Sequence, residues 1–180
     1  MKFIIFLILL SLNSVQAEIY KTAITTDSGI EFYWWPVLPN VPRWHHDREH
    51  SLHCRINAQA PDNNTFSNAE TEIYARALYK PRIPDTKSLS QLIVNDKNNF
   101  LNKNSSIIIS GSEGLIDGDG NTLQSFTFFP KNEGTWEKVS YSEEADFYLL
   151  FTISSRSKSG LESILPMYNE YTRKYKESPE

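Results

Sequence analysis

Residues 146–154 read Asp-Phe-Tyr-Leu-Leu-Phe-Thr-Ile-Ser, and they contain the longest apolar run of the chain beyond its N-terminal segment. The aromatic and β-branched residues of this run favour a strand. Apolar residues then recur at steps of three and four between Ser159 and Lys176, which predicts a one-sided helix. Because a helix with one apolar face must bury that face, the end of the chain predicts a sheet that is covered by a helix.

The rest of the chain repeats these two patterns. Asp85–Leu101 predicts a second one-sided helix, with Asp85 or Thr86 as its cap. Further segments read as strands, at Ile19–Thr25, Ile30–Leu38, His50–Ala60, Glu72–Tyr79, Ser106–Ser110, Leu123–Phe129 and Trp136–Tyr141. Short turns between neighbouring strands favour antiparallel pairing, and the Asp-Gly sequences at Asp117–Asn121 are expected to form one such turn. We therefore expect an α+β fold, with an antiparallel β-sheet of about six to eight strands and two principal helices packed on it.

The order of these elements resembles a known architecture. Pro42-Arg43-Trp44 precedes an early strand, a helix follows in mid-chain, and the chain closes with the strand at residues 146–154 and its helix. This order resembles the Mog1/PsbP-like α/β/α sandwich, and also the small exported bacterial proteins of unknown function that share it, over most of residues 30–175. Characterised members of that fold serve as assembly or interaction modules, and most have no enzymatic activity. The resemblance therefore implies a binding protein.

The first residues have the layout of a signal peptide. Met1 and Lys2 give a positive start, Phe3–Leu12 is apolar, and the small residues Val15 and Ala17 precede the expected cleavage site. The apolar run is about half as long as a membrane-spanning helix requires. We therefore expect residues 1–17 to be a cleaved signal peptide and residues 18–180 to form a single domain without a transmembrane segment. The mature protein is expected to be periplasmic or secreted.

Charge and cysteine content limit the classes of partner and the disulfides that the chain can form. The chain has a formal net charge of −4, and its basic residues are scattered along the sequence. No dense basic patch is available to neutralise a phosphate backbone, so we expect no nucleic-acid partner. Cys54 is the sole cysteine, so no disulfide can form within the chain. We expect its thiol to lie in the core, with a bound thiol or an interchain disulfide as the alternatives.

All four histidines lie within residues 44–54. Histidine is a preferred zinc ligand, so the candidate ligands of a metal site are His45, His46, His50 and His53. A helix over this segment would place the last three on one face, whereas a strand would direct His53 outward and Cys54 inward. The alternation of apolar and polar residues up to residue 60 favours the strand. We therefore expect solvated histidines and no cofactor, and zinc binding stays an alternative.

Aromatic residues with a polar edge suit interfaces, and several gather at residues 32–44. The candidate partner-binding residues are Trp34, Trp35 and Trp44. We therefore expect an exported, non-enzymatic interaction or assembly protein of the bacterial envelope, which binds an unknown protein or envelope component. Two alternatives stay open: a metal- or small-ligand-binding protein that uses the histidines, and a hydrolase. The sequence has no Gly-x-Ser-x-Gly or His-Glu-x-x-His motif, so a hydrolase site would be one that no motif reveals.

Overall fold

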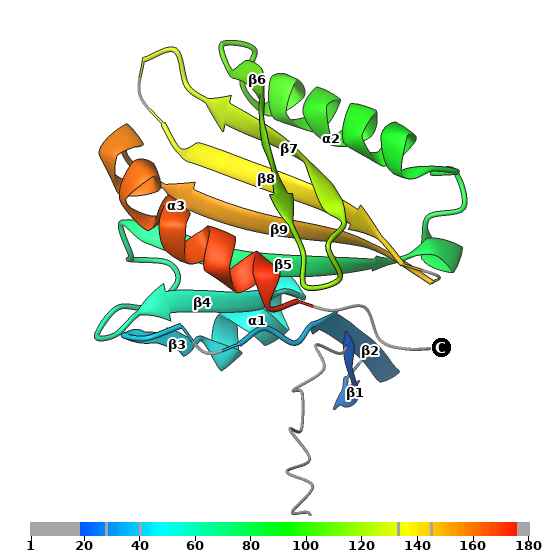
Figure 1. The fold of residues 1–180 in the computed structure, drawn as a ribbon. Coiled ribbons are helices and arrows are strands. Elements are labelled where there is room, and N and C mark those ends of the chain that lie inside the picture. The colour runs from blue at the N-terminus through cyan, green and yellow to red at the C-terminus, as the bar shows by residue number, and fades with distance from the viewer. Residues whose placement is uncertain (1–18, 28, 40, 133, 145, 176–180) are drawn as a thin grey trace, which may run out of the picture.

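The computed structural model describes residues 19–27, 29–39, 41–132, 134–144 and 146–175 (Figure 1). The expected signal peptide lies outside these residues, and its export role stays a prediction. The first half of the described chain carries β1 (Ile19–Thr26), β2 (Gly29–Pro36), β3 (Trp44–His46), α1 (Arg48–Cys54), β4 (Asn57–Pro61), β5 (Thr71–Tyr79) and the 3₁₀ turn η1 (Lys80–Arg82). The second half carries α2 (Leu89–Lys103), β6 (Ile108–Ile116), β7 (Thr122–Phe129), β8 (Trp136–Glu143), β9 (Phe147–Ser155) and α3 (Lys158–Arg173).

The strands form two antiparallel sheets. Within the described residues, β1 and β2 pair only with each other, and the other strands form a seven-stranded sheet in the order β3-β4-β5-β9-β8-β7-β6. The apolar run within residues 146–154 forms β9, which lies in the middle of this sheet and is buried along its whole length. The large sheet and the helices packed on it confirm the expected α+β fold.

The helices α2 and α3 cover opposite faces of the large sheet (Figure 1). Successive side chains of a strand point to opposite faces, so alternate residues of β9 divide between two cores. Leu149 and Phe151 pack with Tyr168 of α3 in the larger core, whereas Leu150 packs with Ile93 of α2 in the smaller core. The sheet is therefore the middle layer of three, which explains why β9 is apolar on both of its faces.

Serine caps fix where the two long helices begin. Ser88 accepts a hydrogen bond from the backbone N–H of Gln91 at 3.2 Å, and Ser157 accepts one from Gly160 at 3.1 Å. Each cap satisfies an amide that the first helical turn leaves without an intrahelical partner. The helix α2 therefore begins after Ser88 and not at the expected position near residue 85. None of the helices in the described residues is long and apolar enough to span a membrane.

The expectation of one continuous strand over residues 50–60 is wrong, because α1 occupies the first part of this range and β4 only the end. Asp47 is the N-cap of α1, and its carboxylate accepts a hydrogen bond from the backbone N–H of His50 at 3.1 Å. Arg55 ends the helix in the left-handed conformation, with φ of 57°. As a result, Cys54 is exposed at the end of α1 and does not lie in the core.

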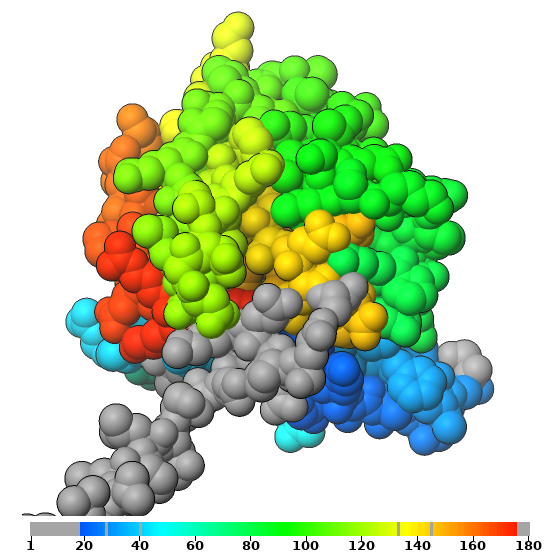
Figure 2. All heavy atoms as spheres, turned by 45° about the vertical axis from the view of Figure 1, so that its right-hand side comes forward, coloured from blue at the N-terminus to red at the C-terminus, as the bar shows by residue number. Residues whose placement is uncertain are grey.

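The strands β1 and β2 form a hairpin that packs on the end of β5. Figure 2 shows this hairpin in blue at the lower edge of the molecule, below the body of helices and sheet. The last residue pair between β4 and β5 is Asn57 with Ala75, so β5 extends beyond the end of β4. There, Trp34 of β2 donates its indole N–H to the carbonyl of Ala77 at 3.1 Å. This bond satisfies a backbone group at the edge of the sheet and anchors the hairpin.

Candidate functional site

Two of the candidate metal ligands bind neighbouring side chains of the α1 region. His46 of β3 lies with Nε2 2.8 Å from the Oγ of Ser51. His50, in the first turn of α1, lies with Nδ1 2.9 Å from the carboxylate of Asp47. The two imidazoles therefore bind different side chains: His46 bonds to Ser51, and His50 bonds to Asp47.

The other two candidate ligands are exposed. His45 lies with Nδ1 3.9 Å from a carboxylate oxygen of Asp62, and His53 lies in the last turn of α1. In the part of the chain that the structure describes, no three histidine, cysteine or acidic side chains are arranged to hold a metal ion. The four histidines are therefore close in the sequence, but their rings do not converge on a common metal site.

The pair of His46 and Ser51 has the residue types of a nucleophilic dyad but not its geometry. Ser51 is fully buried, and its hydroxyl donates to the carbonyl of Asp47 at 2.7 Å and accepts from the N–H of Ala58 at 2.9 Å. His46 then donates to Ser51, which is the reverse of the proton transfer that activates a serine. Partial burial lowers the pKa of His46, which favours the neutral ring. These contacts tie α1 to the sheet and do not expose a nucleophile.

Asp47 organises this segment. Its buried carboxylate accepts hydrogen bonds from the backbone N–H groups of His50 and Phe66 and from the ring of His50. Burial raises the pKa of Asp47, but the hydrogen bonds from Phe66 and His50 and the charge of His50 outweigh it and hold the pKa below its ordinary value. Asp47 thus joins α1 to the loop before β5, and α1 in turn sets the position of Arg55.

The three candidate tryptophans lie at different places. Trp35 is buried and stacks on Tyr20, with ring centroids 5.1 Å apart. Trp44 is half-buried on β3 and packs against the larger core. Trp34 is half-buried on the side of the hairpin that faces β5, because neighbouring strand residues point to opposite faces. Of the three, Trp34 lines a pocket between the hairpin and the end of β5.

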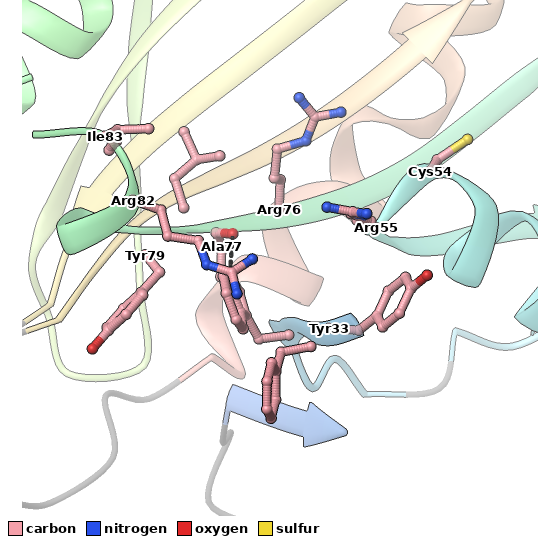
Figure 3. A pocket seen from close by; sticks show the side chains of 11 residues that line it. Tyr33, Cys54, Arg55, Arg76, Ala77, Tyr79, Arg82 and Ile83 are labelled. Atoms are coloured by element: carbon pink, nitrogen blue, oxygen red, sulfur yellow. Dashed lines mark hydrogen bonds between the residues drawn. The ribbon is translucent and has the colours of Figure 1, made fainter. Parts of the chain in front are cut away.

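A pocket of about 310 Å³ lies between the hairpin, the end of α1 and the end of β5 (Figure 3). We call it the hairpin pocket, and its lining includes Tyr33, Trp34, Arg55, Arg76, Tyr79 and Arg82. The guanidinium of Arg82 lies 4.6 Å from the ring centroid of Trp34, and that of Arg55 lies 5.2 Å from the centroid of Tyr33. Figure 3 shows Arg55 and Arg82 extending into the same space from different elements. Each contact between a cation and a ring is worth about 0.5–1 kcal/mol when exposed.

The hairpin pocket carries a positive charge. Three arginines line it, and no carboxylate does. Arg55 pairs with Glu31 at 2.6 Å, whereas no acidic side chain of the described residues lies within ion-pair distance of Arg76 or Arg82. The chain as a whole has a net charge of −4. The positive charge is therefore local to the pocket.

The hairpin also carries much of the exposed apolar surface. Among the described residues, eight large hydrophobic side chains are exposed, and four of them belong to the hairpin or follow it directly: Tyr20, Ile30, Phe32 and Val37. Ile30 is 66% exposed and Phe32 is 53% exposed. Phe32 lines both the hairpin pocket and a neighbouring hollow of about 460 Å³. Apolar surface thus lies directly beside the arginines, as is typical of interfaces.

A second cavity, of about 340 Å³, lies between α2 and the sheet. We call it the α2 cavity, and its lining includes Tyr74, Arg76, Asp96, Phe100, Lys103 and Glu137. The sheet register brings its polar residues together: Tyr74 of β5 pairs with Thr152 of β9, and Glu137 of β8 pairs with Ser154, two residues along β9 and on the same face. The α2 cavity therefore combines β5, β8 and α2, which are far apart in the sequence.

Phenol groups hold the two carboxylates of the α2 cavity. Tyr74 donates to Glu137 at 3.1 Å, and Tyr141 donates to Asp96 at 2.5 Å. Burial raises the pKa of Glu137, the hydrogen bond from Tyr74 lowers it, and the charge of Asp96 raises it again. Burial also raises the pKa of Asp96, against the hydrogen bond from Tyr141. Carboxyl groups with perturbed pKa values in a cavity are typical of functional sites.

Glu72 adds a third carboxyl group to the same face of the sheet. It pairs with Ser154, which pairs with Glu137, so two strand spacings or about 9.6 Å separate the backbones of the two glutamates. Burial raises the pKa of Glu72 to about 7; the charge of Arg156 lowers it and the charge of Glu137 raises it. Glu72 therefore changes its charge near neutral pH.

Sequence reasoning pointed to the histidines and tryptophans, and it missed the arginines of the hairpin pocket and the carboxylates of the α2 cavity. Their spacing in the chain carries no signal, because each site collects residues from separate elements. One signal was present in β5, where polar residues at 72, 74 and 76 alternate with apolar residues in a strand that helices cover. Comparison with known proteins adds no family, because no family model and no curated protein matches the chain.

Proposed function

We propose that the protein is an exported, non-enzymatic interaction protein whose hairpin pocket binds an extended acidic segment of an envelope protein. The observation that carries this proposal is the charge of the pocket: three arginines and no carboxylate line it, on a chain with a net charge of −4. Arginine holds carboxylates through two parallel hydrogen bonds. Acidic side chains of a partner therefore complement Arg82, which pairs with no acidic side chain of the described residues.

Apolar surface beside the pocket supports a protein partner. Phe32 is exposed and lines the hairpin pocket together with the half-buried Trp34, and Ile30 is exposed farther along the same face of β2. Aromatic residues and arginine are enriched at the centres of protein interfaces, where they contribute most of the binding energy. A segment that carries an apolar residue beside its acidic residues would cover both parts of this surface.

The helices α2 and α3 lie on opposite faces of one antiparallel sheet, which is a general arrangement and not one specific to the Mog1/PsbP-like sandwich that the order of the elements resembles. That resemblance in turn favours an assembly or interaction role over an enzymatic one. The histidine segment supports neither of the alternative functions, since its rings do not converge in the described residues and Ser51 is buried.

Binding of defined peptides tests the proposal. Fluorescence polarisation would compare a labelled peptide of alternating glutamate and phenylalanine with a matched peptide in which lysine replaces each glutamate. We expect only the acidic peptide to bind. Arg82→Gln should weaken its binding about tenfold or more, because a hydrogen bond between charged groups is lost. The matched control, Arg173→Gln, changes an exposed arginine of α3 and should leave the affinity unchanged.

Two results would contradict the proposal: equal binding of the two peptides, or an Arg82→Gln variant that binds the acidic peptide as well as the wild type does. Binding to vesicles of anionic phospholipid without binding to the acidic peptide would assign the pocket to a lipid surface instead. Cell fractionation tests export separately, and the mass of the mature chain should correspond to a start at Glu18.

A further inference from the structure

The α2 cavity contains opposite charges that do not pair. Arg76 and Lys103 face the carboxyl group of Asp96 closely enough to lower its pKa, and Lys103 acts in the same way on Glu137. Nevertheless, none of the ion pairs found in the described residues includes any of these four side chains. All four line the cavity. The charges therefore border an open space and do not neutralise one another by contact.

Each carboxylate keeps one oxygen available. Tyr74 donates to Oε2 of Glu137, and Tyr141 donates to Oδ2 of Asp96. No other hydrogen bond of the described residues reaches either carboxylate, so Oε1 of Glu137 and Oδ1 of Asp96 remain as acceptors. The phenol groups also hold the two carboxylates in place before a ligand arrives. Such preorganisation lowers the entropy cost of binding.

We propose that the α2 cavity binds a small zwitterion, which is a free amino acid or a ligand of similar size with one ammonium and one carboxylate group. The ammonium group lies between Asp96 and Glu137, and the carboxylate group lies against Arg76 and Lys103. Both pairs of like charge then gain a counter-charge from one molecule. A ligand with a single charge would leave one pair uncompensated.

Size and shape also favour this class of ligand. The volume of about 340 Å³ lies at the lower end of the range for small-molecule sites. A sugar would need an open aromatic face, but Phe100 already stacks on Phe128 with ring centroids 4.0 Å apart. The remaining lining includes apolar residues such as Val139 and Leu150, which would contact an aliphatic side chain. Leucine is therefore a suitable probe.

Nuclear magnetic resonance titration of the mature protein tests this proposal. The probes are L-leucine, L-leucinamide, which lacks the carboxylate, and 4-methylpentanoate, which lacks the ammonium group. We expect leucine to shift the amide resonances of β5, β8 and α2, and to bind about tenfold or more tightly than either analogue, because each analogue loses hydrogen bonds between charged groups. L-Glutamate and L-lysine, titrated in parallel, show whether the cavity prefers a charged side chain.

Two variants remove one charge each. Glu137→Gln keeps an acceptor for Tyr74, and Lys103→Gln changes an exposed side chain, so the second remains informative if the first fails to fold. Each should weaken leucine binding about tenfold, whereas the controls on α3, Glu170→Gln and Lys158→Gln, should not. Arg76 is left unchanged, because it lines both pockets. The two variants therefore test leucine binding without changing a residue of the hairpin pocket.

The proposal is overturned if none of the three amino acids shifts these resonances at millimolar concentration. It is also overturned if leucine and its two analogues bind equally, or if Glu137→Gln and Lys103→Gln bind leucine as the wild type does. Acidic-peptide binding at the hairpin pocket is expected to persist in both variants, whichever result is obtained.

Discussion

Replacing Asp47 by alanine should lower the free energy of unfolding by about 3 kcal/mol. The carboxylate of Asp47 is buried and accepts three hydrogen bonds, two from His50 and one from Phe66. Loss of the helix cap at the backbone N–H of His50 costs about 1 kcal/mol. The N–H of Phe66 and the ring of His50 also lose their acceptor, at about 1 kcal/mol each.

Urea unfolding followed by tryptophan fluorescence measures the loss in free energy of unfolding, and thermal unfolding measures the accompanying change in melting temperature. The melting temperature should fall by about 6–12 °C, at about 2–4 °C for each kcal/mol in a domain of this size. Asp47→Asn should lie between wild type and alanine, because it keeps one acceptor for the cap. Asp62→Ala is the matched control, since that carboxylate is exposed and lies 3.9 Å from His45; it should cost less than about 0.5 kcal/mol.

The pH dependence gives a second check. The pKa of Asp47 is lowered in the folded state, mainly because hydrogen bonds from Phe66 and His50 outweigh its burial. Its stabilisation is therefore complete above the unfolded-state pKa of about 3.9, and it is lost as the pH falls through the lower folded-state pKa. The difference between wild type and Asp47→Ala should shrink in this acid range. A cost no larger than that of Asp62→Ala, or a cost that is independent of pH, would refute the reasoning.

Three further changes test other parts of the structure. Glu72→Gln should unfold at a higher urea concentration than the wild type near pH 8 but not near pH 4. Burial raises the pKa of Glu72 to about 7, so the wild type loses stability as the pH rises from the unfolded-state pKa of about 4.3 through that value. Parallel pH profiles of the two proteins would contradict this. Cys54 should react with a thiol reagent in the folded protein, because it is exposed; a thiol that reacts only in urea would show that it is covered. Trp34→Phe should lower the free energy of unfolding by about 1–2 kcal/mol, because the carbonyl of Ala77 loses its donor; an unchanged urea midpoint would show that the indole bond contributes nothing.

Local patterns in the sequence were sufficient to predict most of the elements. The segment that forms β9 is a continuous apolar run and the segment that forms α3 has one helical periodicity, so in each the signal accumulates along the length of the element. Residues 50–60 misled the prediction because their apolar residues alternate, although the first part is helical. The deciding contacts are the cap at Asp47 and the buried hydroxyl of Ser51, which bonds to Ala58 of the neighbouring strand. The cap bond itself is local, but the Asp47 carboxylate also accepts from the N–H of Phe66, and Ser51 bonds across to β4, so tertiary contacts reinforce the helix.

The candidate sites were less accessible to sequence reasoning. Trp34 was predicted as a binding residue from its aromatic neighbourhood, and it lines the hairpin pocket. Its companion there, Arg82, follows 48 positions later in the chain, since 82 − 34 = 48. The two meet only because β2 packs on the end of β5 where β4 has ended. No local pattern encodes how far one strand extends beyond its neighbour.

The amino-acid order alone determined most of the strands, the two long helices and the need for helices to cover the sheet, because those properties follow from side-chain periodicity and apolar content; it did not determine α1. Only the tertiary structure decided that Glu137 meets Tyr74, and that Lys103 lines the same cavity without forming an ion pair with Asp96 or Glu137. The physical reason is register: side chains on a strand alternate faces, so the pairing of β5, β9 and β8 determines which polar groups share one cavity.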